Sequence, residues 1–186
     1  VAAAEFLISE LKVPVTCSNL SSSLALKKIT EKRGGSYYSS PVGEINVVEK
    51  MKKFNAAIGG EGNGGVIYPK THYGRDSLIG TGMILSILAK REVSLSELKN
   101  SLPSFYITKT KTKFQGSLNQ VIDNFKKEFS NEKIDLQDGI RIDFDNSWVH
   151  VRKSNTEPVM RIISEAETIE KSEELSNKII SKLQLL

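Results

Sequence analysis

The sequence predicts an α/β domain followed by a smaller α+β domain. In roughly the first hundred residues, helical and extended patterns alternate in short units, which is typical of a sheet with helices on its faces. After Leu102-Pro103 the pattern changes to closely spaced strands with helices at both ends, which indicates an antiparallel sheet. We therefore predict two domains: residues 1–102 around a mixed sheet, and residues 103–186 around an antiparallel sheet packed with helices.

The elements of the first domain follow from apolar spacing and from residues that start or stop helices. Helices are predicted over residues 2–11, from the serine run 21–23 to about 33, over 45–53, and over the strongly apolar stretch 78–90. Strands are predicted over residues 14–17, 36–39 and 56–59. Gly34-Gly35 ends the second helix, as glycines beyond a helix C-terminus do.

The second domain is predicted from one long strand, two helices and a group of three strands. The helices cover residues 118–129 and about 169–183, and the strands cover residues 105–114, 140–144, 148–151 and 159–163. Asp145-Asn146-Ser147 has the composition of a hairpin turn between the first two strands of the group. Lys109, Lys111 and Lys113 would share one face of the long strand, which favours a solvated edge strand.

Size and composition exclude several classes of protein. A chain of 186 residues can form one large or two small domains, and 39% hydrophobic with 26% charged residues is ordinary for a globular protein. No stretch approaches the roughly 20 apolar residues that cross a bilayer, and the start is not a signal peptide, so no membrane partner is expected. The single Cys17 cannot form an internal disulfide, and a reducing cytoplasm is the predicted compartment.

A glycine-rich loop, residues 59–65, follows one of the predicted strands. It contains the letters G-x-G-x-x-G, but a dinucleotide site needs a helix at the last glycine, and residues 66–69 are extended and end in proline. A backbone that approaches a ligand closely, with Glu61 and Asn63 facing vicinal sugar hydroxyls, fits better. The alternative is a flexible surface turn with a solvated Glu61.

A second polar loop, Arg152-Lys153-Ser154-Asn155-Thr156-Glu157-Pro158, joins two strands and is followed by Arg161. Arginine presents a fork of donors that matches phosphate oxygens, and hydroxyl, amide and backbone N–H groups complete such a cradle. A phosphorylated ligand is therefore the first hypothesis. The alternative is an ordinary polar hairpin loop, because Ser, Asn and Thr are common turn formers.

Together the two loops resemble those of the α-D-phosphohexomutase family, which interconverts sugar 1-phosphates and 6-phosphates. The third domain of that family carries G-E-x-S-G-H and the fourth carries R-x-S-N-T-E-P; here residues 60–65 read G-E-G-N-G-G and residues 152–158 read R-K-S-N-T-E-P. Asn63 stands where the family often has Ser, and Gly65 where it often has His. The resemblance covers essentially the whole chain and implies a fourth domain with a TATA-binding-protein-like fold.

The resemblance also implies roles for individual residues. The phosphate that is not reacting would be gripped by Arg152, Ser154, Asn155, Thr156 and Arg161, while Glu61 and Asn63 would hold ring hydroxyls.

A third loop, residues 41–44, looks like the family's loop that helps contact substrate through residues such as Gly43 and Glu44. Glu44 could attract an amino sugar, or it could cap the helix that begins nearby. Gly74-Arg75-Asp76 resembles a family segment that opens the apolar helix, and its Arg–Asp pair is interpreted as structural.

The family's phosphoserine loop, of the form T-A-S-H-N-P, and its magnesium loop, of the form D-G-D-x-D-R, do not occur in this sequence. Because the chain also starts without Met, we expect the C-terminal half of a phosphohexomutase, which binds hexose phosphate but is inactive without the N-terminal catalytic domains. Catalytic residues and Mg²⁺ ligands are expected outside this chain. Asp143 and Asp145 are interpreted as solvated, and the two histidines do not indicate a metal site.

Two other function classes stay open. A stand-alone sugar-phosphate-binding or regulatory module would have the same loops without catalysis. A nucleic-acid-binding module would use the lysine strand, but no aromatic residues interleave with the lysines to stack on bases. The choice among glucose, mannose and glucosamine phosphates, and the oligomeric state, do not follow from the sequence.

Overall fold

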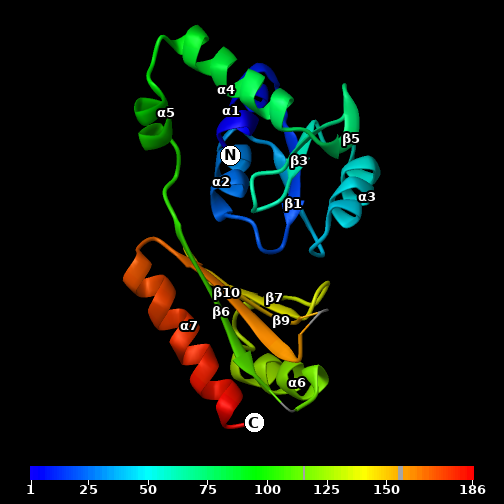
Figure 1. The fold of residues 1–186 in the computed structure, drawn as a ribbon, viewed down its shortest axis with the longest axis vertical. Coiled ribbons are helices and arrows are strands. Elements are labelled where there is room, and N and C mark those ends of the chain that lie inside the picture. The colour runs from blue at the N-terminus through cyan, green and yellow to red at the C-terminus, as the bar shows by residue number, and fades with distance from the viewer. Residues whose placement is uncertain (115, 155–156) are drawn as a thin grey trace. The chain divides into compact units, whose positions relative to one another are not determined.

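A computed structural model describes residues 1–114, 116–154 and 157–186 of the chain. The chain divides into two compact units, Val1–Ser104 and Phe105–Leu186 (Figure 1). The boundary predicted from the sequence lies after Leu102, two residues earlier. The first unit contains a mixed sheet with helices on both faces, and the second contains an antiparallel sheet with helices. The predicted fold classes are therefore confirmed.

The sheet of the first unit has the strand order β2-β1-β3-β4-β5. Its strands are β1 (Val15–Asn19), β2 (Ser36–Ser40), β3 (Ile58–Gly60), β4 (Val66–Tyr68) and β5 (His72–Arg75). Strand β1 pairs in parallel with β2 and β3, whereas β4 is antiparallel to β3 and β5. Because β1 lies between β2 and β3 and is parallel to both, its carboxyl end lies next to that of β3, where the glycine-rich loop begins.

The helices of the first unit are α1 (Ala2–Glu10), α2 (Leu24–Lys32), α3 (Glu44–Phe54), α4 (Ser77–Arg91) and α5 (Leu95–Ser101). The first four of these cover the two faces of the sheet (Figure 1). Helices α1, α2 and α4 share a core with Ile58 of β3, while Val47 and Met51 of α3 pack on the other side with Cys17 of β1. Gly59 faces Met51, and a Cβ atom there would overlap the Met51 sulfur, so a larger residue would displace the Met51 side chain.

Helix α2 begins and ends as the sequence predicts. The Ser23 hydroxyl accepts a hydrogen bond from the Ala25 N–H at 3.1 Å, which satisfies one of the free amides of the first turn. At the other end Gly34 adopts a φ of 70°. The Gly34 and Gly35 N–H groups donate to carbonyls of the last turn at 2.9 and 3.0 Å, which is the Schellman arrangement.

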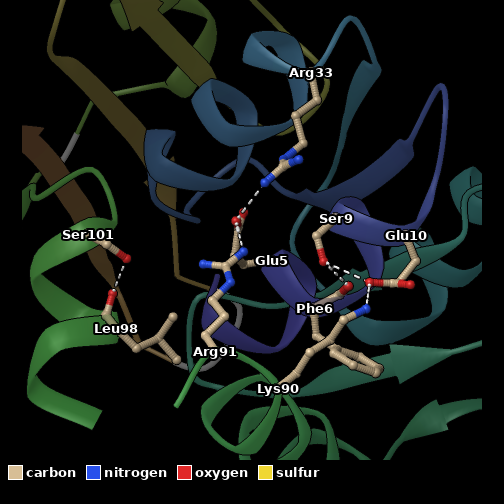
Figure 2. A network of polar contacts seen from close by, with 9 residues as sticks. All are labelled: Glu5, Phe6, Ser9, Glu10, Arg33, Lys90, Arg91, Leu98 and Ser101. Carbon is tan, nitrogen blue, oxygen red and sulfur yellow. Dashed lines mark hydrogen bonds and ion pairs between the residues drawn. The ribbon is translucent and has the colours of Figure 1, made fainter. Parts of the chain in front are cut away.

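A buried carboxylate ties three helices of the first unit together (Figure 2). Glu5 of α1, whose side chain is 9% exposed, accepts hydrogen bonds at one oxygen from Arg33 at the end of α2 and from Arg91 of α4, at 2.9 and 2.7 Å. Lys90 pairs with Glu10 nearby. Charge-assisted bonds from two guanidinium groups offset the cost of burying the carboxylate.

The second unit is an antiparallel sheet in the order β6-β10-β9-β8-β7. Its elements are β6 (Tyr106–Lys113), α6 (Leu118–Glu128), β7 (Lys133–Asp135), β8 (Ile140–Asp143), β9 (Trp148–Lys153), β10 (Val159–Ala166) and α7 (Ile169–Gln184). One face carries the core, in which Val151 and Ile162 pack with Phe125 of α6 and Ile179 of α7. Alternation along the strands places their neighbours Arg152 and Arg161 on the opposite face.

Strand β6 lies at the edge of this sheet, and Lys109, Lys111 and Lys113 are exposed on it, as predicted. The hairpin turn at residues 145–147 is confirmed as well, since the Phe144 N–H donates to the Ser147 carbonyl at 2.9 Å between β8 and β9.

Three elements were not predicted: β5, α5 and β7. The count of three strands after α6 is wrong, because Lys133–Asp135 adds β7 at the sheet edge. Strands β5 and β7 are short and lack an apolar alternation, so only pairing with a neighbour defines them. Helix α5 did carry a signal, a capping box in which Ser94 and Glu97 bond each other's backbone N–H.

Candidate functional site

The glycine-rich loop between β3 and β4 is closed by its own backbone. The Glu61 N–H donates to the Gly65 carbonyl and the Gly64 N–H donates to the Glu61 carbonyl, both at 3.1 Å. Gly64 has a φ of 95°, a conformation that side-chain-bearing residues rarely adopt. The Asn63 side-chain oxygen accepts from the Gly65 N–H at 3.2 Å, so this exposed amide braces the loop.

The loop packs against another part of the chain. A Cβ atom on Gly62 would lie 2.8 Å from the Ser21 carbonyl oxygen in the turn after β1. The glycine therefore permits a close contact between two backbone segments. Residues 62–64 are nevertheless exposed, as in a surface turn.

Glu61 is held by partners from two other strands. Its side chain is 9% exposed. One carboxylate oxygen accepts from the side-chain amide of Asn19, at the end of β1, at 3.2 Å. The other oxygen lies 3.4 Å from a terminal guanidinium nitrogen of Arg75, at the end of β5. The carboxylate is thus oriented from both sides.

Glu44 is the first residue of α3, after the N-cap Gly43, which has a φ of 123°. Its charge lies in the first helical turn, as the helix-cap alternative expects, yet its two oxygens bond Arg75 instead of an α3 amide. The Arg75 backbone N–H donates at 3.0 Å and its Nε at 2.8 Å. The Arg75 backbone hydrogen bond, followed by the guanidinium, lowers the pKa of Glu44 against the opposing effect of burial.

The interpretation of Arg75 and Asp76 as structural agrees with their contacts, since each bonds other parts of the first unit. Arg75 bonds the two glutamates described above, whereas Asp76 caps α4 by accepting from the Leu78 and Ile79 N–H groups at 2.9 and 3.0 Å. Asp76 also bonds His72 at 3.1 Å. Consecutive strand residues point to opposite faces, so Arg75 and Asp76 reach different partners.

The phosphate-loop motif lies between β9 and β10. Asn155 and Thr156 are outside the described residues. The Ser154 N–H donates to the Val159 carbonyl at 2.9 Å, and its hydroxyl, in a residue only 6% exposed, accepts from Arg161 Nε at 3.3 Å. Arg161 pairs in register with Arg152, so two guanidinium groups start from neighbouring positions on one face.

Arg152 has an acidic neighbour in the turn before β8. A terminal nitrogen of Arg152 lies 3.6 Å from the Asp138 carboxylate, and the Asp138 carbonyl accepts from His150 Nε2 at 2.5 Å. Gly139, with a φ of 69°, lets this turn lie directly against Arg152, whose Cα would be 3.0 Å from an added Cβ. Burial lowers the pKa of His150, and the Asp138 carbonyl and charge oppose that shift.

Two acidic residues of the second unit, Glu157 and Asp143, form ion pairs. Glu157 of the motif pairs with Lys111 of β6 at 3.0 Å, and that hydrogen bond, with the lysine charge, lowers the pKa of Glu157. The interpretation of Asp143 as merely solvated is wrong, because Arg141 donates to it at 3.0 and 2.7 Å. The two residues alternate onto the same face of β8 and therefore reach each other.

The described residues include no group of three or more His, Cys, Asp and Glu side chains that could hold a metal ion. Burial raises the pKa of the Cys17 thiol to about 12, so it stays protonated near neutral pH. Among the described residues, no helix is both long enough and apolar enough to span a bilayer.

Models of two protein domains match this chain. Residues 1–106 match phosphoglucomutase/phosphomannomutase, alpha/beta/alpha domain III, and residues 110–182 match the C-terminal domain of the same family. The chain therefore belongs to the phosphoglucomutase/phosphomannomutase family, as the two loops indicated.

Individual relatives agree with this membership. A phosphoglucomutase/phosphomannomutase from Thermococcus kodakarensis is 38% identical over 159 residues, which are 84% of this chain and 35% of the relative. A phosphoglucosamine/phosphogalactosamine mutase from Sulfurisphaera tokodaii is 36% identical over 148 residues, 77% of this chain and 31% of the relative. The chain thus spans about a third of the length of these curated relatives.

Solved structures share the fold. A phosphoglucomutase/phosphomannomutase family protein from Burkholderia thailandensis superposes with a TM-score of 0.77 at 23% identity, covering 97% of this chain and 40% of that one. The N-acetylphosphoglucosamine mutase of Aspergillus fumigatus, in complex with GlcNAc-6P and magnesium, gives a TM-score of 0.65 at 13% identity, covering 96% of this chain and 41% of that one.

Proposed function

We propose that this chain supplies the sugar-binding and spectator-phosphate-binding loops of a phosphohexomutase that interconverts hexose 1-phosphate and hexose 6-phosphate. The observation that carries the proposal is the second loop, where Arg161 bonds Ser154 and stands opposite Arg152 in the strand register. Guanidinium donors and a hydroxyl in this arrangement suit a phosphate dianion. The Asp138 carboxylate, 3.6 Å from Arg152 and 22% exposed, limits the repulsion between the two arginines.

In this proposal the phosphate is bound mainly by charge. Arg152 and Arg161 donate forked hydrogen bonds, and Ser154 adds a hydroxyl. Asn155 and Thr156 complete the set. The phosphate bound here is the one that does not react, so these residues position the substrate without forming or breaking bonds.

The sugar is held by the loops of the first unit. Glu61 accepts hydrogen bonds from ring hydroxyls, helped by Asn63, and the loop with Gly43 and Glu44 lies on the same side through the shared partner Arg75. A carboxylate already oriented by two donors loses little entropy when the sugar binds.

The chemistry of the whole enzyme, in the same proposal, uses a phosphoserine outside this chain. Its phosphoryl group passes to the free hydroxyl of the sugar phosphate and gives a bisphosphate and a serine hydroxyl. The bisphosphate turns around, and its other phosphate returns to the serine. The present residues bind and reorient the sugar, and the chain by itself is expected to have no turnover.

Magnesium enters only as a proposal for the full-length enzyme. The fungal structural neighbour was solved with magnesium and a hexosamine phosphate. The described residues of this chain offer no metal-binding cluster, so they do not fit the ion and we assign it no step here.

The test is turnover of the full-length parent protein with glucose, mannose and glucosamine 1-phosphates. We expect conversion of at least one to its 6-phosphate, dependent on a serine encoded upstream of Val1, and none with residues 1–186 alone. Binding of hexose phosphate by a parent that lacks any mutase activity would instead support the alternative, a sugar-phosphate-binding or regulatory module.

A further inference from the structure

The side chain of Arg75 lies across Gly65, the last residue of the glycine-rich loop. A Cβ atom built on Gly65 would be 2.5 Å from Arg75 Cδ and 2.9 Å from Cγ. Contacts that short do not occur between carbon atoms, so the arginine can take this path only over a glycine. Gly65 and Arg75 therefore form one steric unit, although they come from different segments of the chain.

Arg75 connects the two carboxylates that face the proposed sugar site. Its backbone N–H and Nε bond both oxygens of Glu44, and a terminal nitrogen lies 3.4 Å from Glu61. The three side chains differ in exposure: 48% for Arg75, 35% for Glu44 and 9% for Glu61. Arg75 thus has the most exposed side chain of the three residues.

The guanidinium also has donors left. A guanidinium carries five N–H groups. Nε is used on Glu44, and the terminal nitrogens make no hydrogen bond within the described part of the chain beyond the ion pair with Glu61. Because the Arg75 side chain is 48% exposed, we infer that these N–H groups can reach a ligand that approaches Glu61.

We propose that Arg75 is a specificity-determining residue of the sugar site, which donates a hydrogen bond to one hydroxyl of a vicinal pair while Glu61 accepts from the other. An acceptor and a donor side by side match a diol, since each hydroxyl can both give and take a proton. Gly65 is required because it leaves the path for the arginine. The inference rests on the proposed function and names the group that reads the sugar ring.

The test uses the full-length parent, with glucose 1-phosphate and its monodeoxy analogues, each lacking one ring hydroxyl, measured by titration calorimetry. We expect the wild type to bind at least two analogues roughly ten- to a hundredfold more weakly than glucose 1-phosphate, the range for hydrogen bonds to charged groups. Arg75→Ala should reduce this discrimination to less than about threefold for one analogue. Arg75→Lys should restore it in part, since lysine keeps the charge without the fork.

Gly65→Ala provides a second route that keeps the arginine in the protein. The added methyl group displaces the Arg75 side chain, so the same analogue should lose its discrimination. In the Arg75→Ala background the Gly65→Ala change should cost less than about twofold, because the clash is gone. Gly82→Ala is the matched control, since a Cβ at Gly82 on α4 meets nothing within 4 Å.

The outcomes separate this inference from the function on which it rests. An Arg75→Ala protein that weakens glucose 1-phosphate and every analogue by one common factor would show a merely structural arginine and overturn the inference. Unchanged affinities would overturn it too, and both results leave the proposed function intact. A wild type that binds no glucose, mannose or glucosamine 1-phosphate would reject the proposed function itself.

Discussion

The two candidate loops use opposite charge arrangements for the same purpose. In the first unit, two glutamates share one arginine, so Glu44, Glu61 and Arg75 together leave an excess negative charge. In the second unit, Arg152 pairs with Asp138 while Arg161, its partner in the strand register, bonds the Ser154 hydroxyl, so these three charged groups leave an excess positive charge. Arg75 orients the two glutamates and Asp138 pairs with Arg152, and neither partner neutralises the whole charge of its loop.

This difference in charge suits each loop to its proposed ligand. Sugar hydroxyls are neutral and directional, so they need a few well-oriented groups, and Glu61 is nearly buried between Asn19 and Arg75. A phosphate carries charge and accepts from many directions, so it needs surplus donors, and Arg161 is exposed. Four predictions test this contrast, in order of decreasing effect.

The largest effect is expected for Arg152→Ala. Loss of a hydrogen bond to a charged group should weaken hexose phosphate binding by about 1.5–3 kcal/mol. Inorganic phosphate should lose affinity by a similar factor, because in the proposed complex Arg152 contacts the phosphate and no other part of the ligand. Lys153→Ala, which removes the same charge from the next, exposed residue, is the control in calorimetry of the full-length protein. Unchanged affinity in a folded Arg152→Ala protein would refute the phosphate cradle.

Glu61→Gln should cost about 1 kcal/mol of hexose phosphate affinity, since a neutral amide replaces a charge-assisted acceptor while the shape is kept. Inorganic phosphate binding should not change. That selectivity is the opposite of the Arg152 result and is what the contrast between the loops requires. Glu49→Gln, on the exposed side of α3, serves as the control. Equal loss for both ligands would mean that Glu61 acts on the whole structure.

His150 should make the stability of the second unit depend on pH. Burial lowers its folded-state pKa below the ordinary value of 6.5, with Arg141 and Arg152 adding to the shift and Asp138 opposing it. The unfolded chain then binds a proton that the folded chain does not, so stability falls as pH drops below 6.5 toward the folded pKa. Denaturant unfolding should show this slope, and His150→Gln should flatten it. An identical slope in the variant would contradict the assignment.

The smallest effect is expected for Lys111→Gln, which breaks the pair with Glu157. The lysine side chain is 66% exposed, so solvent and salt screen the interaction. The thermal midpoint should barely move, and any change should vanish at high salt. A large loss of phosphate affinity, beyond that of Lys109→Gln on the same face, would give the lysine strand a role in the site.

Salt-dependent DNA binding that Lys111→Glu abolishes would favour the nucleic-acid alternative.

Much of the fold could be predicted from the sequence because its signals are local. Apolar spacing defined α2, α6 and α7, and serine and glycine marked the ends of α2. Strands β5 and β7 were missed because three or four residues without alternation carry no period. Their existence depends on a neighbouring strand that offers hydrogen bonds.

In the candidate site, the motif residues could be predicted from the sequence, but their partners could not. Glu61 and the arginines of the second loop stand in recognisable motifs, whereas Asn19 and Asp138 do not, and the segment that contains Arg75 gave no indication of its bonds to Glu44 and Glu61. These partners lie in other strands or turns, and the Asn19–Glu61 contact, for example, spans 42 positions. No spacing rule links residues that far apart, so only pairing of the strands brings them together.

The sequence by itself determined the two domain classes, the two loop motifs and the family to which they point, because helical periods, caps and short motifs are written in consecutive residues. Only the tertiary structure decided that Glu44 and Glu61 share Arg75, that Gly65 makes room for it, and that Asp138 stands behind Arg152. Those contacts join strand ends that are distant along the chain, and the hydrogen-bonded sheet sets the distance between them.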